Sequence, residues 1–219
     1  MNTEYIITNK ATHQGINGYT KIILISIVIL VHSGVWYFVN IYNSLRPATS
    51  LNNLTTLVDS WIPYIGWSWF VYYSGHLFIL IVGSVIVWQL GRKDFFRIIL
   101  IICLMIITAG IIQLILPAKS PLPEKMNIVH QWFHANVFDD QYVCFPSLHV
   151  ALSVLPGGIY IRYFKSFFFK IVVVIIIISI FLSTISLKEH YFVDSVAGVI
   201  LAIFFLMIFN YYHLKSESQ

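Results

Sequence analysis

Long uncharged stretches divide this chain of 219 residues, and they constrain its fold more than any other feature of the sequence. A helix needs about 20 mostly apolar residues to cross the hydrocarbon core of a bilayer. Five such stretches stand out, and a sixth is shorter and contains Pro156, Gly157 and Gly158. Because backbone polar groups within lipid must be satisfied inside the segment, we predict an all-α polytopic membrane protein. The expected spans are residues 22–42, 69–90, 98–116, 146–163, 171–187 and 192–212.

The distribution of lysine and arginine sets the expected orientation, because basic residues are retained on the cytoplasmic side. With six crossings, nine of the 13 basic residues fall on one side. If residues 146–163 did not cross, Arg162, Lys165 and Lys170 would change sides and the asymmetry would collapse. We therefore predict a six-helix bundle with both termini cytoplasmic. No repeat or linker divides the chain, so residues 1–219 are expected to form one membrane-embedded domain.

Composition excludes several classes of protein. The chain is 58% hydrophobic and 10% charged, unlike an ordinary soluble domain. Its basic residues are dispersed rather than clustered with aromatic ones, so we expect no nucleic-acid partner. Cys103 and Cys144 would lie at different membrane depths, which makes a disulfide unfavourable. We expect a multi-pass protein of a cell membrane, without a cleaved signal peptide.

His190 and Asp194 stand four residues apart at the start of the last expected span. At 3.6 residues per turn they project from nearly the same helix face. A carboxylate there can hold one imidazole nitrogen and direct the other outward as a nucleophile or base.

A second set of residues opens the fourth expected span, where Pro146 and Ser147 precede His149. Proline suits the first turn of a helix, and the N–H groups after it, with a donor from Ser147, would form a phosphate cradle. His149 would then be placed to protonate a leaving alkoxide.

Given six crossings, the fourth and sixth spans both begin at the outer face, so the two histidines can converge there. This arrangement can support phosphoryl transfer without a metal or cofactor, because that chemistry needs mainly positioning and charge stabilisation. Lys188 could bind phosphoryl oxygens, as could Lys119. These residues also have interpretations without catalysis. The histidines could be polar groups at the membrane interface, and the lysines could extend their charges to the membrane surface.

Other polar residues invite weaker interpretations. His130 and His134 have the i, i+4 spacing of zinc ligands, and Asp139 or Asp140 could add oxygens, but a wet loop face explains them equally well. His32 and His76 lie within apolar spans, where polar contacts between helices are the default. A glycosylation sequon at Asn53 matters only if the cell glycosylates.

These motifs resemble those of the type 2 phosphatidic acid phosphatase superfamily, whose second motif reads Pro-Ser-Gly-His and whose third contains His-x-x-x-Asp. The closer likeness is to the branch of inositol phosphorylceramide synthases, which favours Phe-Pro-Ser-Leu-His-Val-Ala, Lys-x-His-Tyr-x-x-Asp and Asp-x-x-Ile-Pro. Here these are residues 145–151, 188–194 and 59–63. The resemblance implies six helices, with His190 as phosphohistidine nucleophile, Asp194 as its support and His149 as general acid.

Departures from the superfamily pattern fall on its phosphate-binding cations. The lysine of the first motif aligns with Gln113, and its Arg-Pro pair aligns with Ser120 and Pro121. The arginine of the third motif aligns with Thr184. The expected function is hydrolysis of a lipid phosphate monoester or pyrophosphate at the extracytoplasmic face. The alternatives are transfer of a head-group phosphoryl unit to a lipid or polyol hydroxyl, and a non-catalytic lipid-binding protein or transporter.

Overall fold

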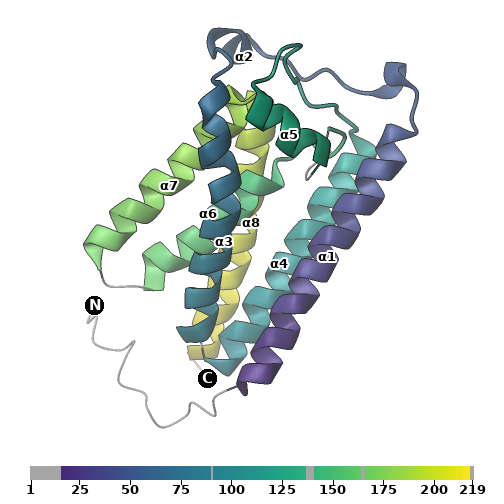
Figure 1. The fold of residues 1–219 in the computed structure, drawn as a ribbon. Coiled ribbons are helices and arrows are strands. Elements are labelled where there is room, and N and C mark those ends of the chain that lie inside the picture. Colours follow the sequence, from purple (N-terminus) through teal and green to yellow (C-terminus); the bar gives the residue numbers. More distant parts are fainter. Residues whose placement is uncertain (1–15, 90, 137–140, 164–165, 218–219) are drawn as a thin grey trace.

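The fold was analysed in a computed structural model that describes residues 16–89, 91–136, 141–163 and 166–217. Its regular structure is helical throughout these ranges. Six long helices form the body of the molecule (Figure 1). They are α1 (Gly18–Ser44), α3 (Trp69–Gln89), α4 (Arg92–Ile115), α6 (Leu148–Tyr163), α7 (Phe167–Ser186) and α8 (Phe192–Glu217). The all-α prediction is confirmed.

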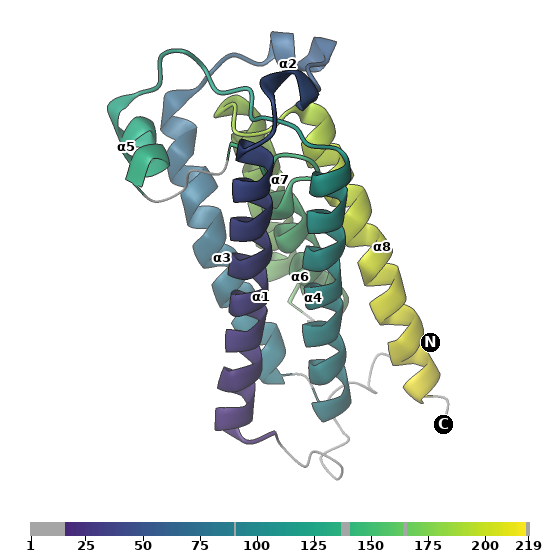
Figure 2. The same ribbon diagram turned by 90° about the vertical axis from the view of Figure 1, so that its right-hand side faces the viewer.

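The long helices run side by side, and α1 lies along α4 in both views (Figure 1 and Figure 2). The start of α1 and the end of α8 lie at one end of the bundle. Two shorter helices, α2 (Leu57–Trp61) and α5 (Ile128–Asn136), lie at the other end (Figure 1). Short 3₁₀ turns occur at Ala48–Ser50 (η2) and Gly66–Ser68 (η3). We call the end that carries α2 and α5 the upper end.

Four of the described helices are long and apolar enough to cross a membrane, namely α1, α4, α7 and α8. Helix α6 is apolar but has only 16 residues. Large apolar side chains on the outside of these helices are exposed, including Leu30 on α1 and Phe204 on α8. Such a surface is favourable in lipid and unfavourable in water. The chain is therefore an all-α membrane protein, and the count of six crossings stays a prediction.

The core joins α4, α6 and α8. Its fully buried members include Phe95 and Met105 on α4, Leu155 on α6, and Phe209 on α8. These helices therefore pack through side-chain interdigitation, which fixes the relative positions of their upper ends. Helices α6 and α8 both begin at the upper end, and the residues at these two starts form the candidate site.

Candidate active site

His149 and His190 meet at the upper end of the bundle. His149 is the second residue of α6, and His190 lies two residues before α8 begins. Their ring centroids are 5.8 Å apart, and His190 is almost fully buried. The two imidazoles are therefore neighbours, close enough for both to contact the same phosphoryl group.

Gly198 allows the two helix starts to approach closely. A Cβ atom at this position would lie 2.5 Å from the backbone oxygen of Ser147. A second contact joins the same elements, since the Ser147 backbone N–H donates to the Asp194 carbonyl at 3.1 Å. The separation of the two histidines is therefore set by backbone-to-backbone packing of α6 against α8.

The start of α6 differs from the sequence prediction, because the helix begins at Leu148 rather than with Pro146 in its first turn. Ser147 caps it: its Oγ accepts from the Val150 N–H at 3.5 Å, and its carbonyl accepts from Ala151 at 3.1 Å. Serine is favoured at this capping position, which moves proline outside the helix. The buried Ser147 hydroxyl thus supports the helix start at which we predicted a phosphate cradle.

The His190 ring is held by a backbone carbonyl rather than by Asp194 directly. Its Nδ1 lies 3.0 Å from the carbonyl oxygen of Cys144 and 3.6 Å from Oδ2 of Asp194. A carbonyl can only accept a hydrogen bond, so Nδ1 carries the proton and the lone pair resides on Nε2. The Asp194 carboxylate therefore faces the predicted side of the ring as an ion-pair partner, at a distance beyond hydrogen-bonding range.

The Cys144 side chain lies between the carboxylate and the imidazole. Its thiol donates to Oδ2 of Asp194 at 2.6 Å, and Sγ is 3.7 Å from Nδ1 of His190. The Tyr191 backbone N–H donates to the same carboxylate oxygen at 2.9 Å. Burial, and then the negative charge of Asp194, raise the pKa of the Cys144 thiol well above its usual value. The cysteine is therefore a neutral hydrogen-bond donor to the carboxylate.

Tyr72 on α3 contacts the other histidine. Its hydroxyl is 3.2 Å from Nδ1 of His149, and the two ring centroids are 4.4 Å apart. The tyrosine is almost completely buried. If the hydroxyl oxygen accepts from Nδ1–H, His149 can carry a second proton on Nε2, and this imidazolium is the form that protonates a leaving group. Sequence analysis missed Tyr72, because only the packing of α3 against α6 brings it to the site.

Lys188 anchors the turn that carries His190. Its φ of 64° lies in the left-handed region, which costs a residue with a side chain about 1 kcal/mol or more. The ammonium donates to the carbonyls of Asp59 and Ile62 at 2.8 and 2.6 Å. Burial lowers the pKa of Lys188, against the opposing influence of Asp59. An ammonium has three N–H groups, so these two bonds leave Lys188 a candidate for a phosphate contact.

Asp59 joins the same turn to the upper layer. Its Oδ1 accepts from the Phe192 backbone N–H, the first residue of α8, at 2.7 Å. Its Oδ2 accepts from the backbone N–H and hydroxyl of Thr56 at 2.7 and 2.6 Å. A carboxylate at this position caps α8 and complements its helix dipole. The Asp-x-x-Ile-Pro segment thus holds the turn that carries His190.

A comparison with protein families adds an independent finding to this geometry. The model of the PAP2 superfamily matches residues 49–208, which include both histidines, Asp59 and Asp194. The chain belongs to the PAP2 superfamily. Membership supports a lipid enzyme of the phosphatase or phosphotransferase type. A comparison with curated proteins found no match.

The positions where PAP2 motifs carry cations hold the loops around the site together. Gln113 donates from Nε2 to the carbonyls of Val143 and Pro146 at 3.1 and 3.3 Å. Thr184 contacts the Ser195 hydroxyl at 2.9 Å, and its carbonyl accepts from the His190 backbone N–H at 3.2 Å. Ser120 is buried and donates from its backbone to the Gln141 carbonyl. Neutral hydrogen-bonding groups therefore occupy the three expected cation positions.

Lys119 is exposed at the edge of this region. Its ammonium lies 5.8 Å from the centroid of the Tyr142 ring. Tyr142 precedes Cys144 by two residues, so Lys119 borders the segment that leads to His149. Its proposed phosphate contact rests on this position alone.

His130 is fully buried, so its interpretation as part of a wet loop face is wrong. Its Nε2 lies 2.6 Å from Oε1 of Glu189, and its Nδ1 lies 3.1 Å from the Tyr64 hydroxyl. Burial lowers the pKa of His130 to about 4. The structure pairs His130 with the residue before His190. Of the other residues in the zinc hypothesis, His134 lies on α5, and Asp139 and Asp140 lie outside the described residues.

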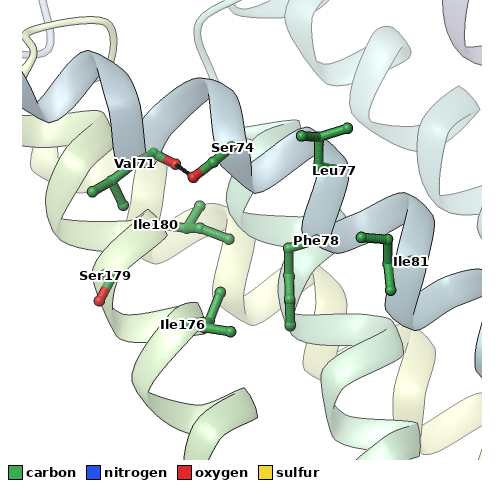
Figure 3. Close-up of a pocket in the computed structure, with 8 residues that line it drawn as sticks. All are labelled: Val71, Ser74, Leu77, Phe78, Ile81, Ile176, Ser179 and Ile180. Atoms are coloured by element: carbon green, nitrogen blue, oxygen red, sulfur yellow. Dashed lines mark hydrogen bonds between the residues drawn. The ribbon is translucent and has the colours of Figure 1, made fainter.

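A mainly apolar groove of about 350 Å³ lies between α3 and α7 (Figure 3). Ile180 is buried in its wall, whereas Leu77 and Ile81 are exposed at its rim. The groove begins at Val71, the neighbour of Tyr72, and reaches Ile81, about 15 Å further along the helix at 1.5 Å per residue. It follows the bundle from the level of the site toward its middle. Its lining residues are Val71, Ser74, Leu77, Phe78, Ile81, Ile176, Ser179 and Ile180.

Proposed function

We propose that this PAP2 superfamily member hydrolyses a lipid phosphate monoester or pyrophosphate through a phosphohistidine intermediate. The observation that carries the proposal is the 5.8 Å separation of the His149 and His190 rings at two neighbouring helix starts. The groove beside Tyr72 offers a place for the hydrocarbon chain of the substrate. The predicted orientation puts the reaction at the extracytoplasmic face of a cell membrane.

In the first half-reaction, Nε2 of His190 attacks phosphorus. The Cys144 carbonyl keeps the proton on Nδ1, so the Nε2 lone pair is available. Attack places positive charge on the imidazole, and the Asp194 carboxylate stabilises it from 3.6 Å. His149 protonates the leaving alkoxide. Ser147, Lys188 and Lys119 are the proposed phosphate contacts.

In the second half-reaction, His149 takes a proton from water, and the resulting hydroxide attacks the phosphohistidine. Free phosphate and the original His190 are then released. The same residue serves as acid and base in turn, as microscopic reversibility requires. The proposed chemistry uses no metal ion or cofactor, because positioning and fixed dipoles supply the stabilisation.

A phosphotransferase is the second candidate, and a specific observation favours it. Gln113, Ser120 and Thr184 put neutral groups where PAP2 motifs carry cations. A phosphodiester donor has less negative charge than a monoester and needs fewer cations. In this alternative, a lipid or polyol hydroxyl replaces the water of the second half-reaction. A non-catalytic lipid-binding protein or transporter is the remaining alternative.

Leaving-group chemistry tests the assignment of the two histidines. His190→Ala should abolish turnover of both alkyl and nitrophenyl phosphates, because the nucleophile is lost. His149→Ala should lose alkyl phosphate hydrolysis but still release a stoichiometric burst of nitrophenolate, since nitrophenolate leaves without a proton whereas the phosphohistidine is no longer hydrolysed. His32→Ala, on α1, serves as the control. The assignment is wrong if His190→Ala turns over either substrate at the rate of the parent protein.

The products separate the alternatives. Purified protein should be incubated with labelled phospholipid donors and with candidate alcohols. Release of free phosphate supports hydrolysis, whereas a new phosphodiester supports transfer. If neither product forms and lipid still binds, the non-catalytic reading holds.

A further inference from the structure

Three side chains that can bind a metal ion converge on the Nδ1 side of His190. They are the Cys144 thiol, the His190 imidazole and the Asp194 carboxylate. One ligand atom from each lies within 4.8 Å of the other two, and all three residues are buried. No other group of three such residues occurs in the parts of the chain that the structure describes. The proposed reaction uses the Nε2 side of His190, whereas this cluster contains its Nδ1 side.

The spacing of the ligand atoms fits a tetrahedral zinc ion. Typical zinc bond lengths to sulfur, nitrogen and oxygen place neighbouring ligand atoms about 3.3 to 3.6 Å apart. Nδ1 of His190 lies 3.7 Å from Sγ and 3.6 Å from Oδ2. The third edge, from Sγ to Oδ2, is a hydrogen bond of 2.6 Å. That edge would have to open by about 1 Å once the thiol proton is lost and the ion separates the two anions.

A second observation also points to a ligand. Oδ1 of Asp194 is completely buried and has no hydrogen-bond partner among the described residues. A buried carboxylate oxygen normally has a donor or a cation as its partner. The carboxylate therefore retains coordinating capacity beyond its bonds to Cys144 and Tyr191.

Charge balance favours a divalent ion at this position. Thiolate and carboxylate together carry two negative charges, and a neutral imidazole adds none. With Zn²⁺ the complex has no net charge. Burial strongly disfavours a net charge, so a neutral complex suits a cluster whose members are at most 5% exposed.

We propose that Cys144, His190 and Asp194 form an inhibitory binding site for a thiophilic divalent cation of the Zn²⁺ class. Binding breaks the hydrogen bond from Nδ1 to the Cys144 carbonyl: the ion takes the Nδ1 lone pair, and the ring proton moves from Nδ1 to Nε2. The thiol proton leaves to solvent. With its Nε2 protonated, His190 cannot attack phosphorus. Inhibition rests on the proposed function, whereas binding of the ion does not.

The burial of the cluster has a kinetic consequence. Cys144 is 1% exposed and Asp194 is fully buried, so the ion reaches the ligands only when the surrounding residues move apart. Inhibition should therefore develop slowly after zinc is added and reverse slowly with a chelator.

Metal binding can be measured without any substrate. The full chain in detergent is titrated with Co²⁺, whose thiolate complexes have a charge-transfer absorption band. The parent protein should show this band at one equivalent, and Zn²⁺ should abolish it by displacement. Cys103→Ser is the matched control, since Cys103 lies on α4 outside the cluster. It should behave like the parent, whereas Cys144→Ser should lack the band.

Inhibition is measured in the same variants, each against its own metal-free rate. The zinc concentration that halves activity should rise at least about tenfold in Cys144→Ser and stay unchanged in Cys103→Ser. If Cys144→Ser does not fold, zinc binding is measured in Asp194→Asn instead. This variant should no longer bind one equivalent of zinc. A cobalt band that persists in Cys144→Ser, or zinc binding unaltered in Asp194→Asn, overturns the proposal. If no lipid phosphate is turned over at all, the proposed function fails, and the cobalt band alone decides the metal site.

Discussion

Replacing Gly198 with alanine tests whether the packing of α6 against α8 sets the geometry of the site. The added Cβ would lie 2.5 Å from the Ser147 carbonyl oxygen and 3.2 Å from Cβ of Val150. Ordinary van der Waals contact requires about 3.4 Å or more, so the helix starts must separate by close to 1 Å. Overpacking of this kind costs about 1 to 3 kcal/mol. A misplacement of 1 Å can lower the rate about 100-fold.

Gly34 provides the matched control, because a Cβ at this position on α1 meets nothing within 4 Å. Gly34→Ala should keep full activity and gain up to about 1 kcal/mol from helix propensity. Thermal unfolding and kcat should be measured for both variants in the same detergent. Gly198→Ala should unfold at a lower temperature, with kcat reduced by one to two orders of magnitude, about what a 1 Å shift predicts. If it is as active and stable as Gly34→Ala, helix packing does not set the distance between the histidines.

Three further perturbations probe other parts of the molecule. Asp59→Ala leaves the N–H of the first residue of α8 without its acceptor, so we expect the free energy of unfolding to fall by about 3 kcal/mol and kcat to decrease. Glu124→Ala, at an exposed position, should change neither quantity. The pKa of His130 falls to about 4 in the folded state. Because the unfolded chain takes up a proton near pH 6.5, stability should be full above that pH and fall by about 3 kcal/mol toward pH 4. Thermal unfolding against pH should show this slope in the parent and a smaller one in His130→Gln. Ser179→Trp should fill the groove and lower kcat/KM for a long-chain lipid phosphate while sparing a short-chain soluble one, and Ile178→Trp on the exposed side of α7 should spare both.

The sequence predicted the parts of the structure that depend on local periodicity. Apolar runs located the six long helices to within a few residues at most ends. The four-residue spacing of His190 and Asp194 predicted their proximity, but the shared helix face was wrong, since His190 lies in the turn before α8. The meeting of His149 and His190 followed from the expected parity of the crossings, and the structure brings the two rings together.

Contacts that depend on the path of the loops could not be predicted. Cys144 reaches Asp194 from a loop 50 residues away in sequence, so no spacing rule identifies it. Tyr72 approaches His149 across 77 residues, through the packing of α3 on α6. The sequence also could not show that the Lys188 ammonium donates to the carbonyls of Asp59 and Ile62, which are 129 and 126 residues away. In each case tertiary packing decides which partner a polar side chain finds.

The charge around the site offers a way to choose between hydrolysis and transfer. A phosphate monoester carries about 1.5 to 2 negative charges at neutral pH, whereas a diester carries one. Gln113 and Thr184 hold loops by neutral hydrogen bonds. The two proposed cations are Lys188, which already donates to two carbonyls, and the exposed Lys119. The electrostatic stabilisation available to a monoester is therefore small. Transfer therefore predicts that a diester with the same chain and leaving group has kcat/KM comparable to that of the monoester or higher. If the monoester reacts at least tenfold faster, backbone donors at the two helix starts must supply the missing charge stabilisation, and hydrolysis is the better assignment.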